Sequence, residues 1–233
     1  MKLLIYRLFN ILYEYQFSIY KPLYYLYKRI SDRDRIVLIK DILRPGMTVV
    51  DIGANIGFYT KILSRLVGPR GIVYSFEPDP ANFSRLYRNL SQFPNIRLVP
   101  EALGSENITL NLYVSPKLNV DHQTYDIGEN RRQIPVPCTT LDNFLGTKTK
   151  LDFMKIDIQG FDYFAILGAR QVLKRSPRCT IMGEYWPYGL KKSGIKPEKY
   201  LQLIRSLGFT IRMFGQADPS DKNSYTDFLA TRS

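Results

Sequence analysis

The sequence contains little cysteine and almost no histidine: Cys138, Cys179 and His122 are its only residues of these types among 233. Two cysteines so far apart make neither a disulfide framework nor a metal-binding spacing. One histidine among scattered aspartates likewise has no recognised ligand pattern. We therefore expect no metal site, and we expect the protein to be cytoplasmic, because reduced cysteines are usual there.

Long hydrophobic runs are also lacking. No apolar stretch reaches the roughly 18 to 20 residues that a membrane-spanning helix needs. The first 20 residues are interrupted by Arg7, Asn10, Glu14 and Gln16 and have no small-residue cleavage site, so we do not expect a secretory signal. The hydrophobic content of 45% and the charged content of 23% are ordinary for a globular protein with one sizeable core.

Acidic residues are outnumbered, because 33 Lys and Arg face 21 Asp and Glu and give a net charge of +12. Nucleic acid, an anionic membrane surface and an acidic glycan would each suit this charge, and so would a solvated basic surface without a partner. The basic residues are scattered and no RNA-binding motif is visible. We therefore do not favour nucleic acid as a partner.

A strand, a glycine-bearing turn and a helix over residues 49–60 form the strongest pattern in the chain, and the next strand, 72–76, ends in Glu77. This arrangement is half of a nucleoside-binding α/β site, in which the acidic strand end accepts the ribose hydroxyls. Gly53 and Gly57 depart from the G-x-G-x-x-G spacing that cradles a pyrophosphate. S-adenosylmethionine has no phosphate, so the pattern favours a methyltransferase over a dehydrogenase.

Other acidic residues follow the ends of predicted strands, where ligands of open α/β sheets bind. Glu101 is expected near the adenine, and Asp157 is expected beside the methionine amine or a substrate hydroxyl. The two glycines would allow close backbone approach. The predicted cofactor-binding residues are Asp51, Gly53, Asn55, Gly57, Thr60, Glu77, Glu101 and Asp157.

Four further blocks follow in order, at residues 101–104, 140–142, 151–160 and 166–169. Together with the glycine loop and Glu77, they resemble the signature of FkbM-type S-adenosylmethionine-dependent methyltransferases over about residues 45 to 185. The resemblance implies a Rossmann-like seven-stranded sheet, S-adenosyl-L-methionine as the cofactor, and O-methylation. The chain departs from the family pattern at Gln159, where a glutamate is usual, so no catalytic role is carried over to this position.

Strands and helices alternate after residue 45, which predicts a mainly parallel α/β sheet with helices on both faces. The expected strands are 47–52, 72–76, 96–99, 152–156, 178–184, 209–214 and 225–231, the last two forming an antiparallel hairpin. Helices are expected near 56–66, 80–90, 161–174 and 197–207. Between 105 and 139, an alternating stretch, a polar loop and the residues Pro135 and Pro137 predict a hairpin-like insertion with an edge strand beside the active site. We divide the chain into an N-terminal helical extension, 1–44, and a methyltransferase domain, 45–233.

The resemblance and the site pattern predict an O-methyltransferase that acts on a hydroxyl of a sugar, a glycolipid or a secondary metabolite. The hydroxyl proton needs an acceptor, and the candidate catalytic bases are His122, Asp157 and Glu184. Asp121 or Asp126 would orient the imidazole. The aromatic segment 185–189 has the character of a lip of the acceptor pocket, because aromatic faces stack on sugar rings.

Two other functions stay open. The positive charge is compatible with a nucleic-acid methyltransferase, which salt-dependent RNA binding would support. The other alternative is a cofactor-binding protein without catalysis that docks to membranes through residues 1–30.

Residues 1–30 are rich in tyrosine and basic side chains and carry a helical apolar stripe. Such a helix could lie peripherally on an anionic membrane surface. The alternatives are that it packs over the catalytic domain or against a second copy of the chain in a homodimer. Pro22 is expected to break or restart the helix. Ser31 is expected to cap a second helix that runs to Leu43.

Overall fold

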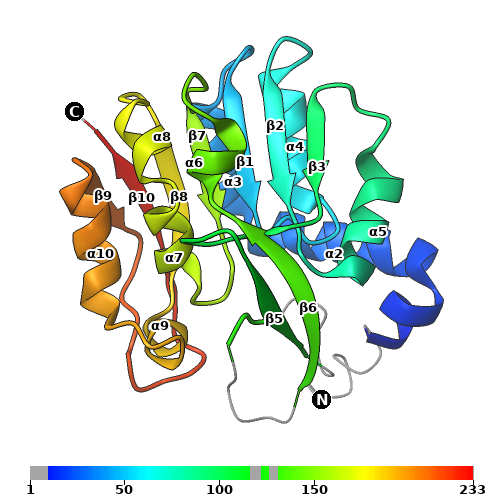
Figure 1. Cartoon of the computed structure of the whole chain (residues 1–233). Helices are drawn as coiled ribbons and strands as arrows, with labels where there is room; N and C mark the ends of the chain where they lie inside the picture. The colour runs from blue at the N-terminus through cyan, green and yellow to red at the C-terminus, as the bar shows by residue number, and fades with distance from the viewer. Residues whose placement is uncertain (1–9, 116–121, 126–130, 233) are drawn as a thin grey trace.

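The computed structural model describes residues 10–115, 122–125 and 131–232, and a seven-stranded sheet lies at its centre (Figure 1). The strands of this sheet are β1 (Thr48–Ile52), β2 (Ile72–Phe76), β3 (Ile96–Val99), β7 (Phe153–Ile156), β8 (Thr180–Tyr185), β9 (Thr210–Met213) and β10 (Thr226–Thr231). Their order is β3-β2-β1-β7-β8-β10-β9, and every pair is parallel except those made by β10. The expected α/β fold, with its closing antiparallel pair, is confirmed.

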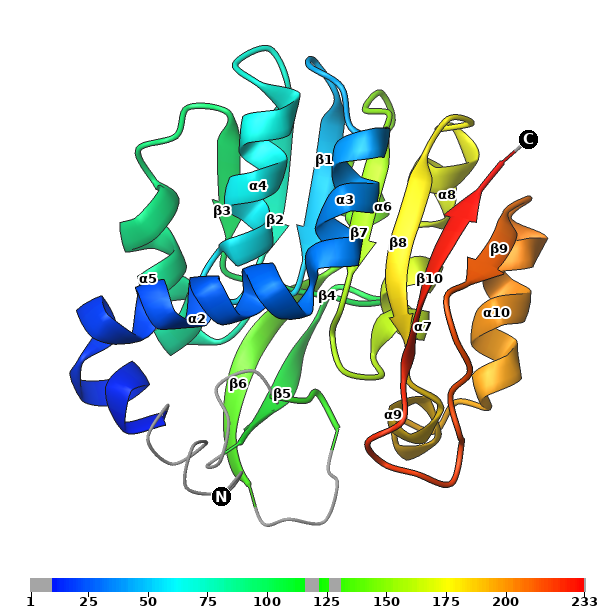
Figure 2. The ribbon, with the colours of Figure 1, turned by 180° about the vertical axis from the view of Figure 1, so that it is seen from behind.

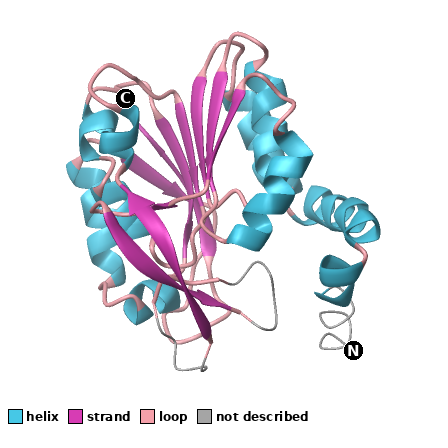
Figure 3. Ribbon diagram, turned by 45° about the vertical axis from the view of Figure 1, so that its right-hand side comes forward, coloured by secondary structure: helices cyan, strands magenta, loops and turns pink. Residues whose placement is uncertain are grey.

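The central strands are buried on both faces because helices cover each side of the sheet (Figure 3). Val49 and Val50 are both fully buried although successive side chains of a strand point to opposite faces. Val49 packs with α3 (Arg33–Ile42) and α4 (Phe58–Val67). Val50 packs with the helices of the other face, which are α6 (Leu141–Leu145), α7 (Asp162–Leu167), α8 (Arg170–Lys174) and α10 (Pro197–Ser206). A further helix, α5 (Pro80–Leu90), connects β2 to β3.

The single helix expected over 161–174 is instead two short helices, α7 and α8, separated at Gly168. A Cβ atom on Gly168 would lie 1.9 Å from the carbonyl oxygen of Gly104, so the chain needs glycine at this close approach. The Gly168 carbonyl also accepts the backbone N–H of Asp142 at 2.9 Å, outside the helical ladder. Packing against distant backbone therefore ends α7. The short helices α6 and α9 (Pro187–Lys192) were not predicted.

The segment between β3 and α6 forms a second sheet of three strands, β4 (Ala102–Leu103), β5 (Ile108–Val114) and β6 (Arg132–Thr139). Strands β5 and β6 pair as an antiparallel hairpin. We expected the strand with the two prolines to lie at the edge of its sheet. This is wrong, because that strand is β6, which lies between β4 and β5. However, β4 pairs only with Cys138 and Thr139, so Pro135 and Pro137 lie where β6 has β5 as its one neighbour.

The N-terminal extension is helical at residues 10–15, in α2 (Phe17–Ser31) and in α3. It runs across the face of the domain that carries α3 and α4 (Figure 2). Pro22 lies inside α2, so the predicted break is wrong; the helix is interrupted at Gln16 instead. The tyrosines of α2 pack onto the domain, and this packing outweighs the hydrogen bond that Pro22 lacks. Ser31 ends α2 rather than capping α3, whose N-cap position is Asp32. Among the described residues, no helix combines the length and the apolar character needed to cross a bilayer.

Candidate functional site

A cavity of about 860 Å³ lies at the carboxyl ends of β1, β2, β7 and β8, where open α/β sheets bind their ligands. Loops after these strands form part of its wall, and α2, α3, α4, the β5–β6 hairpin and the segment leading into β10 also contribute. Seven of the residues predicted for the site line this cavity, namely Gly53, Asn55, Glu77, Glu101, His122, Asp157 and Glu184. The other three, Asp51, Gly57 and Thr60, are buried behind the wall.

The loop after β1 is shaped by three left-handed backbone positions, at Gly53 (φ 79°), Asn55 (φ 50°) and Gly57 (φ 91°). A Cβ atom on Gly53 would lie 2.2 Å from the carbonyl oxygen of Asp157, so glycine lets the loops after β1 and β7 meet at the cavity. A Cβ atom on Gly57 would lie 2.5 Å from a methyl carbon of Leu90. Gly57 therefore serves the packing of α4 against α5, whereas Gly53 borders the cavity.

Glu77 extends from the end of β2, and the backbone holds its carboxylate in place. Its Oε2 atom accepts the backbone N–H of Asn55 at 2.8 Å, and its Oε1 atom accepts that of Asp79 at 3.0 Å. Burial raises the pKa of Glu77 to about 7, although these two hydrogen bonds oppose the rise. The Asn82 side chain also hydrogen-bonds to this carboxylate, and the remaining lone pairs can accept ribose hydroxyls.

Asp51 and Thr60 were predicted to touch the cofactor, but the structure places them under the loop, where they hold Lys155. The Thr60 hydroxyl donates to Asp51 Oδ2 at 2.7 Å, and Lys155 Nζ lies 3.2 Å from Asp51 Oδ1. Lys155 Nζ also donates to the carbonyl oxygen of Gly53 at 3.1 Å. Burial alone would lower the pKa of Lys155, but the charges of Asp51 and Asp157 raise it above its ordinary value. A charged lysine thus fixes the loop after β1 from below.

Asp157 directly follows β7, and Glu184 lies near the end of the adjacent strand β8. Both line the same cavity, yet their pKa values are shifted in opposite directions. Burial would raise the pKa of Asp157, but the charges of Lys155, Arg35 and Lys28 hold it below its ordinary range. Burial and the nearby charge of Asp157 raise the pKa of Glu184 well above its ordinary range, and Arg35 only partly opposes them. The cavity therefore holds two neighbouring carboxylates whose surroundings favour different protonation states, ionised for Asp157 and protonated for Glu184.

Arg35 is a charged residue of the cavity that the sequence did not predict. It comes from α3, and its guanidinium lies 3.7 Å from Glu184 Oε2 and forms a hydrogen-bonded ion pair with Asp227 of β10. The charge of Asp227 raises the pKa of Arg35, although burial opposes this, so the guanidinium stays charged. Residues 35 and 227 are 192 positions apart, and no local pattern marks either of them.

His122 lies in the cavity wall, but its hydrogen bonding does not suit the predicted role of general base. Its Nδ1 atom accepts the backbone N–H of Ser115 at 3.1 Å, and its Nε2 atom lies 3.9 Å from Asp79 Oδ2. A neutral imidazole has one acceptor nitrogen and one donor nitrogen. Because Nδ1 is the acceptor, Nε2 carries the proton and is a donor. Asp121 and Asp126, which were expected to orient the ring, lie outside the described residues.

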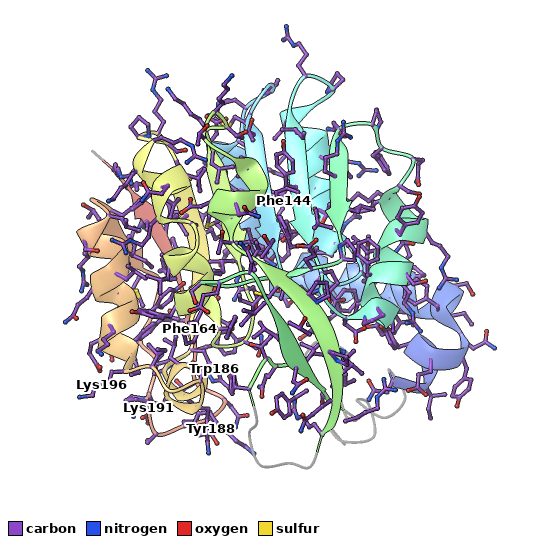
Figure 4. The ribbon with its side chains drawn as sticks, in the orientation of Figure 1. Phe144, Phe164, Trp186, Tyr188, Lys191 and Lys196 are labelled. Atoms are coloured by element: carbon purple, nitrogen blue, oxygen red, sulfur yellow. The ribbon has the colours of Figure 1, made fainter. Side chains whose placement is uncertain are left out.

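The aromatic segment after Glu184 supplies part of the cavity wall, as Trp186 and Tyr188 both line it. Figure 4 shows these two side chains at the α9 end of the molecule. The Trp186 indole donates to the carbonyl oxygen of Lys222 at 2.9 Å, which ties α9 to the loop before β10. A Cβ atom on Gly189 would lie 2.1 Å from the indole ring, so the glycine permits the ring to lie flat on α9.

Comparison with known proteins places this geometry among methyltransferases. Residues 51–211, more than half of the chain, match the family described as the methyltransferase FkbM domain. Methyltransferase 1 of Beauveria bassiana is 28% identical over 143 residues, which cover 52% of this chain and 57% of that protein. The 2-O-methyltransferase NoeI of Sinorhizobium fredii is 23% identical over 151 residues, 57% of this chain and 61% of that protein. The chain thus spans only about three-fifths of the length of either relative.

Among solved structures, a putative rRNA-methylase from Clostridium thermocellum aligns with a TM-score of 0.56. The alignment covers 86% of this chain and 94% of that chain at 13% sequence identity. At this identity the likeness bears on the fold alone, and the fold that it supports is the one predicted from the sequence.

Proposed function

Since the chain belongs to the FkbM methyltransferase family, we propose that it transfers a methyl group to a hydroxyl of a sugar, a glycolipid or a secondary metabolite. S-adenosylmethionine was the expected cofactor, and the family match confirms it. When bound, it supplies a methyl group activated by an adjacent sulfonium. The residues of the cavity would then have three tasks: to hold the cofactor, to orient the acceptor hydroxyl and to take up its proton.

The loop after β1 and the end of β2 would hold the cofactor. The Glu77 carboxylate would accept the two ribose hydroxyls, and Glu101, at the cavity between β3 and β4, would lie toward the adenine. Asp157, the carboxylate with the lowered pKa, would remain ionised beside the cationic amine of the methionine part. Gly53 leaves room for the ligand to approach the backbone.

The observation that carries the proposal is the opposite pKa shift of Asp157 and Glu184 in one cavity. When the surroundings of two carboxylates separate their pKa values, one carboxylate can stay ionised while the other exchanges a proton. Glu184 would take the proton of the acceptor hydroxyl as the C–O bond forms and the bond from the methyl carbon to sulfur breaks. The electron pair of that bond stays on the sulfur, which leaves uncharged.

The acceptor end of the cavity supports a ring-bearing alcohol as substrate. Trp186, Tyr188 and Tyr225 line the cavity together with the polar residues Lys222 and Asn223. Aromatic faces combined with polar groups are suited to stack on a sugar ring while binding its hydroxyls. The name of the relative NoeI, a 2-O-methyltransferase, supports a hydroxyl as the methyl acceptor.

A transfer assay with methyl-labelled cofactor tests the proposal. We expect label to enter sugars or glycolipids as a stable ether, and Glu184→Gln to lower the rate by about 10²–10⁴-fold, the usual share of acid–base catalysis. Glu198→Gln, an exposed change of the same type on α10, is the matched control and should leave the rate unchanged. Label appearing only in RNA would instead support the nucleic-acid alternative, and full activity of Glu184→Gln would remove Glu184 as the base.

A further inference from the structure

Helix α2 has two apolar faces. The first carries Tyr20 and Tyr24, which are buried or half-buried against the domain. The second, which we call the aliphatic row, consists of Ile19, Leu23, Leu26 and Ile30. The spacing of four, three and four residues places the row on one side of the helix. Its members are between 43% and 71% exposed, so the row faces solvent in the described structure.

The domain holds α2 in this orientation. Lys21 Nζ donates to Asn89 Oδ1 at 2.7 Å, and the Tyr25 hydroxyl donates to the carbonyl oxygen of Ile56 at 3.3 Å. The row therefore cannot turn inward without breaking these contacts. α2 crosses below α3 and α4 on that face of the molecule (Figure 2). Single exposed apolar side chains are common and need no explanation, but several aligned on one side of a helix indicate an interaction surface.

The charges beside the row indicate the nature of its partner. The sequence of α2 contains Lys21, Lys28 and Arg29 and no acidic residue, and of these Lys28 forms an ion pair with Asp32, which follows the helix. Arg29 is exposed, and so is Arg33 at the start of α3. Two copies of α2 facing each other would bring cations together without acidic partners from this helix, in a chain of net charge +12. An anionic lipid surface would instead supply the opposite charge.

The size of the row also favours lipid over a second copy of the chain. A standard protein interface engages roughly 20–30 residues on each side, whereas the row offers four aliphatic side chains. An interfacial helix needs only one apolar face that enters the boundary between head groups and acyl chains, flanked by basic residues. The outer side of α2 has both features.

We propose that the aliphatic row of α2 binds anionic membrane surfaces, with Arg29 and Arg33 contacting lipid phosphates. Tyr27, Lys28 and Ser31 of the same helix line the cavity. Docking would therefore hold the cavity close to the lipid, where a membrane-bound acceptor could reach it. This last consequence rests on the proposed function, but the docking itself does not.

Sedimentation of the full chain with two vesicle preparations tests the docking without any measurement of activity. One preparation is phosphatidylcholine alone, and the other also contains phosphatidylserine. We expect binding to the second, weakened by salt, and little binding to the first. The double variant Leu23→Glu/Leu26→Glu should bind the anionic vesicles less tightly by roughly tenfold or more, and Arg29→Gln/Arg33→Gln by on the order of tenfold.

The matched control is Ile108→Glu/Phe214→Glu, which adds the same charge at exposed apolar side chains of β5 and of the loop after β9. It should bind like the wild-type chain, and thermal melting should show that all variants fold. Equal binding to both vesicle types, or unchanged binding of Leu23→Glu/Leu26→Glu, would overturn the proposal. A dimer in analytical ultracentrifugation that this variant abolishes would assign the row to a second copy of the chain.

Discussion

One part of the cavity wall comes from neighbouring stretches of the chain, and another part comes from residues far apart in sequence. The first, which we call the loop wall, contains Gly53, Asn55 and Glu77, and backbone N–H groups hold its carboxylate. The second, the assembled wall, contains Arg35 and Glu184, with Asp227 as the partner of the guanidinium. Backbone N–H groups of Asn55 and Asp79 position the Glu77 carboxylate of the loop wall. The assembled wall depends on the charge of each member, so one change alters the others.

The largest effect on the pH–rate profile is expected from Arg35→Ala, because Arg35 opposes the rise in the pKa of Glu184 and lowers that of Asp157. Without the guanidinium, the pKa of Glu184 rises further, and the ionised fraction at neutral pH falls. Since an opposite charge nearby shifts a pKa by about one to three units, the rate at neutral pH should fall roughly 10–1,000-fold and recover as the pH increases. The pH–rate profile measures this shift.

Arg35→Lys keeps the charge and should keep the profile close to that of the wild-type enzyme. Lys40→Ala, an exposed change on the same helix, is the matched control and should leave the rate unchanged. A lowered rate with an unshifted profile would mean that Arg35 acts only through the packing of α3. Melting temperatures separate that case from unfolding, because removing one partner of a buried ion pair also destabilises the fold.

The difference between the walls explains how much could be predicted. The order of strands and helices follows from periodicity, and this prediction is confirmed. The glycine loop and Glu77 were identified from residues close in sequence, and the structure places both at the cavity. The ion pair of Arg35 with Asp227 forms across 192 positions, and the sequence contains no sign of it. Residues 1–44 were interpreted as an extension, yet α3 supplies part of the cavity.

Nonlocal packing also explains the errors within the loop wall. Asp51 and Thr60 lie in the predicted motif, but their orientation depends on Lys155, a residue of another strand. The break at Gly168 likewise depends on the backbone of Gly104, far from it in sequence. A motif therefore indicated which loop surrounds the ligand, but it did not distinguish side chains that face the ligand from those that support the loop.

A smaller effect is expected on cofactor affinity when the pH changes, because Glu77 of the loop wall titrates. Burial raises the pKa of Glu77 to about 7, and the ionised form is the one that can accept both ribose hydroxyls. Binding of S-adenosylmethionine should therefore weaken as the pH falls below 7, by at most about tenfold per pH unit for one proton. Calorimetric titration between about pH 5.5 and 7 measures this dependence.

Glu77→Gln should bind the cofactor more weakly and lose the pH dependence in this interval, because the amide does not titrate. Glu106→Gln, at an exposed position, is the matched control. If the wild-type affinity is constant over the interval, the ribose is not held by a titrating Glu77. This result would leave the assembled wall unaffected, because that wall is tested by the rate and not by cofactor affinity.

The smallest effect is expected at His122, which lines the cavity from the segment between β5 and β6. Its Nδ1 atom accepts the Ser115 N–H, so the imidazole presents a donor to its surroundings. His122→Asn places a carbonyl oxygen close to the position of Nδ1 and should preserve that hydrogen bond. The rate should then fall less than about tenfold, whereas loss of a general base costs about 10²–10⁴-fold. His122→Phe, which fills the space without an acceptor, should be the more damaging change of the two. Equal losses of the larger size in both variants would show that the imidazole itself takes the proton, and Glu184 would then have to be a structural partner of Arg35.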